Sequence, residues 1–183
     1  FGRMTAFHGQ MGMFTRALAY ILSHGADGLR QVAEDAVLNA NYILRSLEDV
    51  LDAPFAHSGP CMHEALFSDK GFAEGISTLD LAKALIDEGF HPMTMYFPLV
   101  VHGAMLVEPT ETESKAALDQ FIMALRSVAE RARAGDQTLK TAPVHAPRRR
   151  LDETLAARKP VVAWREPVPA AGEAPTPSEV GDR

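Results

Sequence analysis

The order of helix-like and strand-like segments constrains the fold of this chain most. Apolar residues recur at helical spacing in residues 11–23 and 27–51, before any strand signal. Short strand-like runs occur only between residues 61 and 108, and a strong helical pattern then extends to about residue 133. Strands confined to one stretch and bracketed by helices are typical of an α+β fold with a short, helix-covered sheet. A sheet of about three strands is marginal alone and depends on such helices.

Capping residues predict where the helices begin and end. The first helix is expected to end at Gly25, because glycine is the usual residue just past a helix end, and Asp27 is a plausible N-cap for the second helix. Ser77 and Asp80 have the spacing of a capping box for a helix that ends at Gly89. Two separate helices are therefore predicted before the first strand.

The sheet and the last helix are predicted from the middle of the chain. The expected strands cover residues 61–68, 95–101 and 104–108. Pro98 removes a backbone donor from the second strand, which should therefore be an edge strand or bend there. Thr110 and Glu113 form a T-x-x-E capping box for the last helix, which should end at Gly135.

Composition changes after residue 135. Residues 136–166 combine arginines, lysines and prolines, which predicts a basic extended arm. Residues 167–183 are rich in proline, alanine and glycine and are expected to be disordered. The predicted division is a small α+β domain over 1–135, the arm over 136–166 and the tail over 167–183.

Charge, cysteine content and hydropathy exclude several classes of function. The net charge of −6 does not suggest nucleic-acid binding. The single cysteine, Cys61, cannot form an internal disulfide and fits a reducing compartment. No apolar run approaches the roughly 20 residues of a membrane span. No signal peptide is visible, and a start at Phe1 rather than Met suggests a fragment of a longer chain.

Local catalytic motifs are missing from the sequence. It contains no P-loop and no G-x-S-x-G. The histidines form neither H-x-x-x-H nor H-E-x-x-H, so no local zinc site or other metal site is predicted. Cys61 and His63 form either a catalytic pair or a packed cysteine beside a satisfied histidine. The lysines show no glycine-rich or apolar signature that would lower a pKa for Schiff-base chemistry.

Other polar residues have both a structural and a functional interpretation. His8 is either a turn residue or a cleft residue at a helix N-terminus, where it would suit an anionic ligand. His91 follows a helix directly and is either a turn residue or a site residue. The segment from Glu108 to Glu113 is first of all a capping motif, and its alternative is part of a site.

Long stretches of the sequence resemble a known family. The most specific are GFHPMTMYFP joined to MLVEPTETESK, with MGMFTRALAYILSHGADGLRQVAEDAVLNANYIL, CMHEALF and APRRRLDETLAARKPVVAW around them. Together they resemble the C-terminal part of the glycine cleavage system P-protein, which is glycine dehydrogenase (decarboxylating), an oxidoreductase. The similarity is closest to subunit 2 of the two-subunit bacterial form and covers about Gly2 to Trp164.

This resemblance implies the small C-terminal domain of an aspartate-aminotransferase-like (fold type I) enzyme that uses pyridoxal 5'-phosphate. The cofactor would serve in the decarboxylation of glycine, and the aminomethyl group would pass to the lipoyl arm of the H-protein. The family's Schiff-base lysine is expected upstream of Phe1, as is most of the cofactor site, so no catalytic residue is assigned within this chain. The expected cleft residues, without assigned roles, are His8, His63, His91, Glu108 and Thr110.

The resemblance also implies partners and a location. The expected partners are subunit 1 in a heterotetramer, the lipoylated H-protein and glycine, with no nucleic acid and no membrane. The expected location is the bacterial cytoplasm, and the fragment alone should be inactive. The alternatives are the small domain of another fold type I pyridoxal phosphate enzyme, such as an aminotransferase or desulfurase, and a non-enzymatic helical interaction module.

Overall fold

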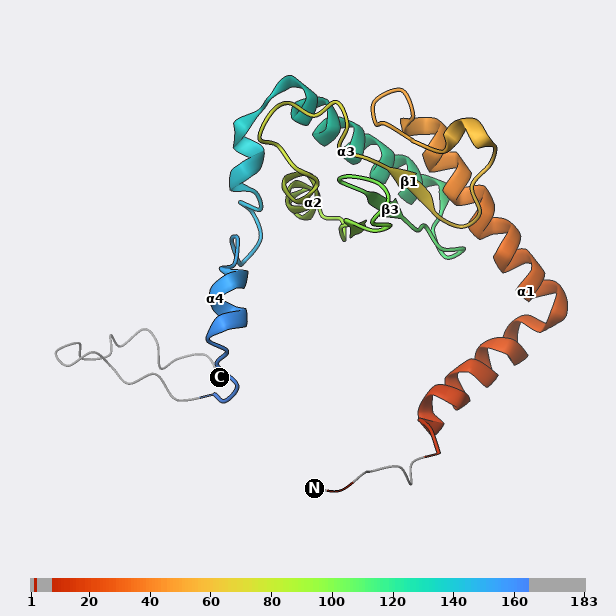
Figure 1. Cartoon of the computed structure of the whole chain (residues 1–183). Helices are drawn as coiled ribbons and strands as arrows, with labels where there is room; N and C mark the ends of the chain where they lie inside the picture. Colours follow the sequence, from red (N-terminus) through yellow and green to blue (C-terminus); the bar gives the residue numbers. More distant parts are fainter. Residues whose placement is uncertain (1, 3–7, 165–183) are drawn as a thin grey trace, which may run out of the picture. The chain divides into compact units, whose positions relative to one another are not determined.

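The computed structural model describes residue 2 and residues 8–164 of the chain. The chain divides into two units, one that ends at Arg150 and one that begins at Leu151 (Figure 1). The first unit contains, in order, α1 (Met11–Leu47), η1 (Ala56–Ser58), β1 (Ala65–Phe67), α2 (Thr78–Asp87), β2 (Thr94–Met95), β3 (Met105–Val107), α3 (Lys115–Ala134) and the 3₁₀ turn η2 (Gln137–Thr141). The described part of the second unit contains the short helix α4 (Glu153–Arg158), whose N-cap Asp152 accepts from Leu155 N.

Helix α1 consists of two helical halves joined at Gly25. The backbone there has φ 63° and ψ −172°, outside the helical region. A Cβ at this position would meet nothing within 4 Å, so the left-handed φ rather than lack of space favours glycine. The predicted break at Gly25 is confirmed, and the second half ends at Leu47 instead of Leu51.

The sheet is antiparallel, with strand order β1-β3-β2. Its strands are shorter than predicted. The strand expected over residues 95–101 is confirmed only at Met95, where it is the edge strand β2, and it is wrong over residues 96–101. Strand β2 stops at Met95 because Tyr96 adopts a φ of 58°, which turns the chain out of the extended conformation. Pro98, which has no N–H for a strand ladder, follows in the loop.

The two predicted capping boxes have different outcomes. Ser77 accepts from Asp80 N, and Asp80 accepts from Ser77 N, so the box that begins α2 is confirmed. The box predicted from Thr110 and Glu113 is wrong. The N-cap of α3 is Ser114, whose hydroxyl accepts from Ala117 N.

Residues 110–113 instead form a turn ahead of α3, with a hydrogen bond from Glu113 N to Thr110 O (3.3 Å). Glu111 and Glu113 therefore lie before the helix, and its first turn contains no acidic residue. The end of α3 at the left-handed Gly135 agrees with the prediction.

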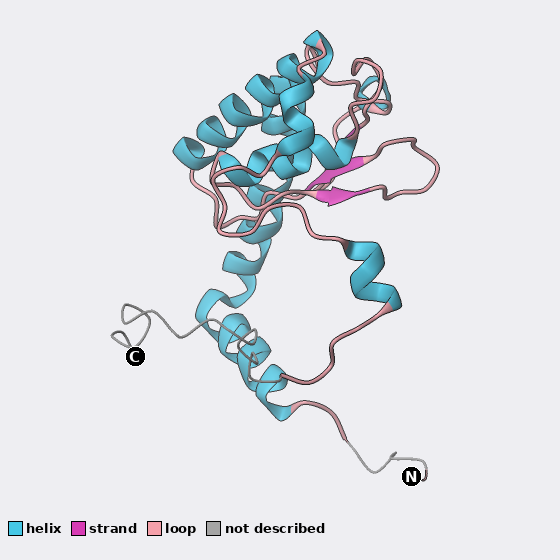
Figure 2. Ribbon diagram, turned by 90° about the vertical axis from the view of Figure 1, so that its left-hand side faces the viewer, coloured by secondary structure: helices cyan, strands magenta, loops and turns pink. Residues whose placement is uncertain are grey.

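The core forms where the second half of α1, α2 and α3 pack against the sheet. In β1 and β3 the outer residues of each strand are buried and the middle residue is partly exposed, as expected when one face of a sheet is covered. Figure 2 shows helices gathered beside the strands. The largest buried side chains include Phe67, Ile43, Leu47, Leu81, Leu85, Met105 and Leu125.

The segment after α3 is more closely packed than the predicted arm. Leu139 is buried, and the Arg150 guanidinium lies 2.7 Å from the Asp80 carboxylate and donates to Ala142 O. The Asp87 carboxylate accepts from the backbone N of Val144 and of the next residue. Residues 136–150 thus belong to the first unit, while the extended arm beyond residue 150 and the domain division stay predictions. The tail over 167–183 lies outside the described residues.

Among the helices that the structure describes, none combines the length and apolar character needed to cross a membrane.

Candidate functional site

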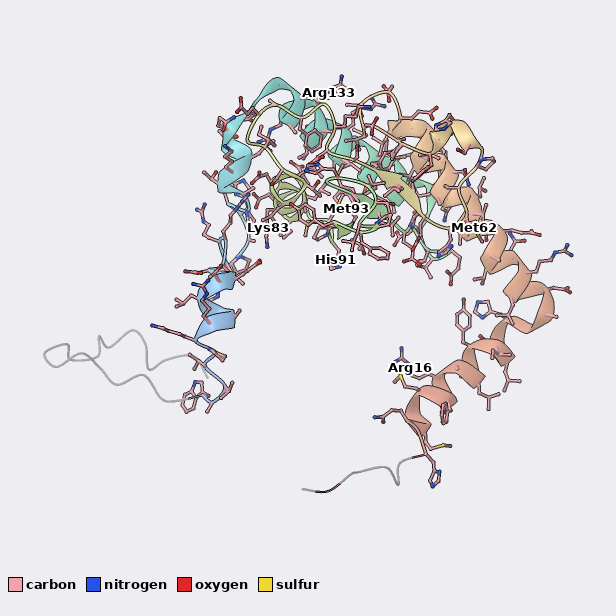
Figure 3. The ribbon with its side chains drawn as sticks, viewed as in Figure 1. Arg16, Met62, Lys83, His91, Met93 and Arg133 are labelled. Carbon is pink, nitrogen blue, oxygen red and sulfur yellow. The ribbon has the colours of Figure 1, made fainter. Side chains whose placement is uncertain are left out.

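One cavity, of about 440 Å³, lies between the segment after α2, the end of β3 and the start of α3. We call it the first cavity. Its charged or titratable lining residues are His91, Glu108 and Glu113, and the described lining contains no Lys or Arg. Phe90 and Phe121 form part of its apolar wall and meet edge to face, with ring centroids 5.5 Å apart. His91 and Met93 lie at the same edge of the core in Figure 3.

A second cavity, of about 460 Å³, lies beside the segment that leads into β1. Ser58, Cys61, His63 and Glu64 supply its polar side chains, and Leu106 lines both cavities. The exposed side chain of Met62, labelled in Figure 3, contributes to its apolar lining.

Cys61 is held by structural contacts in this second cavity. Its backbone N–H donates to the Asn41 side-chain oxygen (3.0 Å), and Asn41 Nδ2 donates to Cys61 O (2.8 Å). Burial raises the pKa of the Cys61 thiol, the opposite of what a nucleophilic cysteine requires. The interpretation as a packed cysteine is therefore favoured over a Cys61–His63 catalytic pair.

His63 lies between two carboxylates. Its Nε2 is 3.7 Å from Glu64 Oε1 and 4.0 Å from Glu108 Oε1. The antiparallel register Ala65↔Val107 explains this, because the residues just outside that pair are Glu64 and Glu108.

His63, Glu64 and Glu108 each have one ligand atom within 4.8 Å of the other two. With small side-chain movements, this spacing would allow the three residues to coordinate a divalent cation. All three side chains are at least partly exposed, and the group also has an ordinary explanation as a surface histidine beside two carboxylates.

The structure brings some of the predicted site residues together and leaves others apart. His63 and Glu108 are neighbours, and His91 shares the first cavity with Glu108. Thr110 lines neither cavity; its hydroxyl contacts that of Thr112 (2.7 Å). His8 is exposed ahead of α1 and also lines neither cavity.

Two acidic residues of the site were not named as expected cleft residues, although Glu113 belongs to the segment whose alternative interpretation was part of a site. Glu64 lies beside Glu108 through strand pairing, and a correct register of β1 on β3 would have revealed it. Glu113 lines the first cavity, whereas the sequence pattern assigned it to a capping box. The functional roles of all these residues stay predictions.

Pyridoxal phosphate requires a lysine that can form a Schiff base, and the described lysines do not provide one. None of Lys70, Lys83, Lys115, Lys140 and Lys159 lines either cavity. Hydrogen bonds to Asp119 and Tyr42 raise the pKa of Lys115, whereas a Schiff-base lysine needs a lowered pKa. Among the residues that the structure describes, the two cavities therefore contain no lysine for a Schiff base.

Comparison with known proteins places these features in a family. The family model described as "Glycine dehydrogenase, C-terminal domain" matches residues 32–147. The chain is 70% identical over 173 residues to the "Probable glycine dehydrogenase (decarboxylating) subunit 2" of Caulobacter vibrioides, covering 93% of this chain and 33% of that protein. It is 49% identical over 164 residues to the protein of the same name from Shouchella clausii, covering 89% and 33%.

A solved structure supports the fold. It is the crystal structure of "glycine decarboxylase (P-protein) of the glycine cleavage system, in inhibitor-bound form", with a TM-score of 0.56, 23% identity, and coverage of 69% of this chain and 28% of that chain. The chain spans about a third of the length of the curated relatives that it matches. On the family match over residues 32–147, this chain belongs to the family of glycine dehydrogenase C-terminal domains.

Proposed function

We propose that this chain is the C-terminal part of glycine dehydrogenase (decarboxylating) subunit 2. The enzyme would decarboxylate glycine with pyridoxal phosphate and transfer the aminomethyl group to the lipoyl arm of the H-protein. The observation that carries the proposal is the 70% identity over 93% of the chain to a relative of that name. The domain would be the smaller part of a fold type I enzyme, and the lysine that holds the cofactor would lie outside this chain.

The first cavity supports a role in binding an amine. Glu108, Glu113 and His91 are its titratable groups, and its described lining contains no Lys or Arg. Two carboxylates in a cavity whose lining lacks lysine and arginine attract a cation such as the ammonium group of an amino acid, and they repel anionic groups. The apolar wall formed by Phe90 and Phe121 lowers the local dielectric constant and strengthens this attraction.

We also propose two protein partners, subunit 1 and the H-protein. The word "subunit" in the names of the relatives supports a second subunit, and we propose assembly with subunit 1 in a heterotetramer. The lipoylated H-protein would receive the aminomethyl group, in the cytoplasm of a bacterium.

The test of this function is a glycine–CO2 exchange assay. Full-length subunit 2 that contains this chain is assembled with subunit 1, pyridoxal phosphate and lipoylated H-protein. Incorporation of labelled CO2 into glycine is expected, with a control in which the H-protein carries no lipoyl group. Failure of a folded, cofactor-loaded assembly to exchange CO2 would overturn the proposal.

Borohydride reduction of the same assembly tests where the cofactor is attached. A single pyridoxyl-lysine outside the 183 residues of this chain is expected by peptide mapping. Stoichiometric labelling of one of the lysines in this chain would contradict the proposal that the cofactor lysine lies outside it.

A further inference from the structure

The loop between β3 and α3, residues 108–114, determines the charge of the first cavity. It carries Glu108 and Glu113, the two carboxylates that line the cavity. Within the loop, the backbone is bent by the hydrogen bond from Glu113 N to Thr110 O. A short irregular segment of this kind depends on contacts with other elements for a fixed position.

Two of these contacts come from α1, one on each side of the bend at Gly25. Asn39 Nδ2, in the second half, donates to Thr110 O (3.0 Å). Tyr20 Oη, in the first half, donates to Glu111 Oε1 (2.7 Å). The Tyr20 ring also lies against the His24 imidazole, with centroids 4.1 Å apart, which restricts the directions that the phenol can take.

The bond from Tyr20 fixes the third carboxylate of the loop. Glu111 lines neither cavity, although it lies between Glu108 and Glu113 in the sequence. The Tyr20 hydroxyl lowers the pKa of Glu111, and the Glu111 carboxylate raises the pKa of Tyr20, as expected for a hydrogen bond to an ionised acceptor. The charge of Glu111 is therefore turned toward α1, and Glu108 and Glu113 are left to face the cavity.

We propose that Tyr20 is a positioning residue for substrate binding, and that it acts through Glu111 to hold the 108–114 loop. Without the phenol hydroxyl, the loop would occupy the binding-competent arrangement for a smaller fraction of the time. The apparent affinity for an amine substrate falls by that fraction, whereas the chemistry after binding is unchanged. The identity of the substrate as glycine rests on the function proposed above.

A double-mutant cycle tests the inference in the assembled full-length enzyme. Tyr20→Phe and Glu111→Ala are each expected to raise KM for glycine about three- to tenfold, the factor that corresponds to the loss of one net hydrogen bond. The value of kcat should stay within about twofold. The double variant should be no worse than either single variant, because both remove the same interaction. Glu111→Gln keeps an acceptor oxygen for the Tyr20 hydroxyl, so its KM should stay within about twofold of the wild-type value.

Tyr42→Phe is the matched control. It also removes a tyrosine hydroxyl from α1 and a bond to a carboxylate, that of Asp119 (2.5 Å), but Asp119 lies on α3 outside the loop. Its KM for glycine should equal that of the wild type. If Tyr42→Phe raises KM as much as Tyr20→Phe, a general loosening of α1 explains the effect and the inference is wrong.

The outcomes separate this inference from the proposed function. An active wild-type enzyme with an unchanged KM in Tyr20→Phe, or with additive effects in the double variant, overturns the inference and leaves the function standing. An inactive wild-type assembly overturns the function. In that case, backbone hydrogen exchange in residues 110–114 tests whether Tyr20 positions the loop. Exchange should be faster in Tyr20→Phe than in the wild type and in Tyr42→Phe, and equal rates would overturn the inference.

Discussion

The two halves of α1 have similar apolar content but different surroundings. In the first half, Leu18 is 56% exposed and Leu22 is 73% exposed. In the second half, Ile43 and Leu47 are almost completely buried in the core. The buried residues of α1 lie only in the last turns of the second half, since Leu38 of that half is 66% exposed. Those last turns and the first half should therefore contribute very differently to stability.

The largest expected effect tests this difference with one substitution in each half. Leu47→Ala removes a fully buried side chain and should lower the free energy of unfolding by about 2–5 kcal/mol. Leu18→Ala removes an exposed side chain and should change it by less than about 0.5 kcal/mol. Urea unfolding of both variants measures the two values. Equal losses would mean that the first half is packed in solution, contrary to the structure.

A smaller effect is expected at the junction of the halves. Gly25→Ala forces alanine to a φ of 63° and a ψ of −172°, a region that is essentially restricted to glycine, and should lower the free energy of unfolding by about 1–3 kcal/mol. Gly12→Ala is the control, because Gly12 is helical and nothing lies within 4 Å of its added Cβ. It should raise helix stability by up to about 1 kcal/mol. A stabilising Gly25→Ala would show that the bend is not kept in solution.

The capping boxes illustrate what a local sequence pattern can and cannot predict. Ser77 and Asp80 formed the predicted box because both partners lie within one turn of the same helix. At Thr110 the same pattern failed. The Thr110 carbonyl is bound by Asn39, 71 residues earlier, and the next residue by Tyr20, 91 residues earlier. A four-residue pattern contains no information about contacts at such separations. It therefore could not predict that the helix begins after Ser114.

The candidate site was predictable only in part for a similar reason. Polar residues beside predicted turns and strand ends directed attention to His63, His91 and Glu108, which line the two cavities. Glu64 joins them through the register of β1 on β3, and the sequence did not specify that register. His8 was chosen for its position before the first helix and Thr110 as part of the turn that begins at Glu108, and the structure places them outside both cavities.

The smallest effect concerns how a tyrosine in each half of α1 lowers the pKa of one carboxylate. Tyr20, in the first half, lowers the pKa of Glu111 below its ordinary value of 4.5, and it is the largest cause of that shift. For Asp119, with an ordinary pKa of 3.8, the largest cause is Lys115, followed by Tyr42 in the second half. A carboxylate with a lowered folded-state pKa contributes stability above its unfolded pKa and loses that contribution as the pH falls through the folded value. Both contributions should therefore disappear in acid, below 4.5 for Glu111 and below 3.8 for Asp119.

Substitution of the tyrosines distinguishes the two carboxylates. Tyr20→Phe should return the pKa of Glu111 most of the way to 4.5, because its largest partner is gone. Tyr42→Phe should raise the pKa of Asp119 only part of the way, because Lys115 Nζ remains 2.8 Å from its carboxylate. Carbon-13 NMR titration of the side-chain carboxyl groups measures both shifts. If the pKa of Asp119 instead returned completely to 3.8, the Lys115 ammonium would also have moved away from the carboxylate. The ion pair between Lys115 and Asp119 would then depend on the Tyr42 hydroxyl.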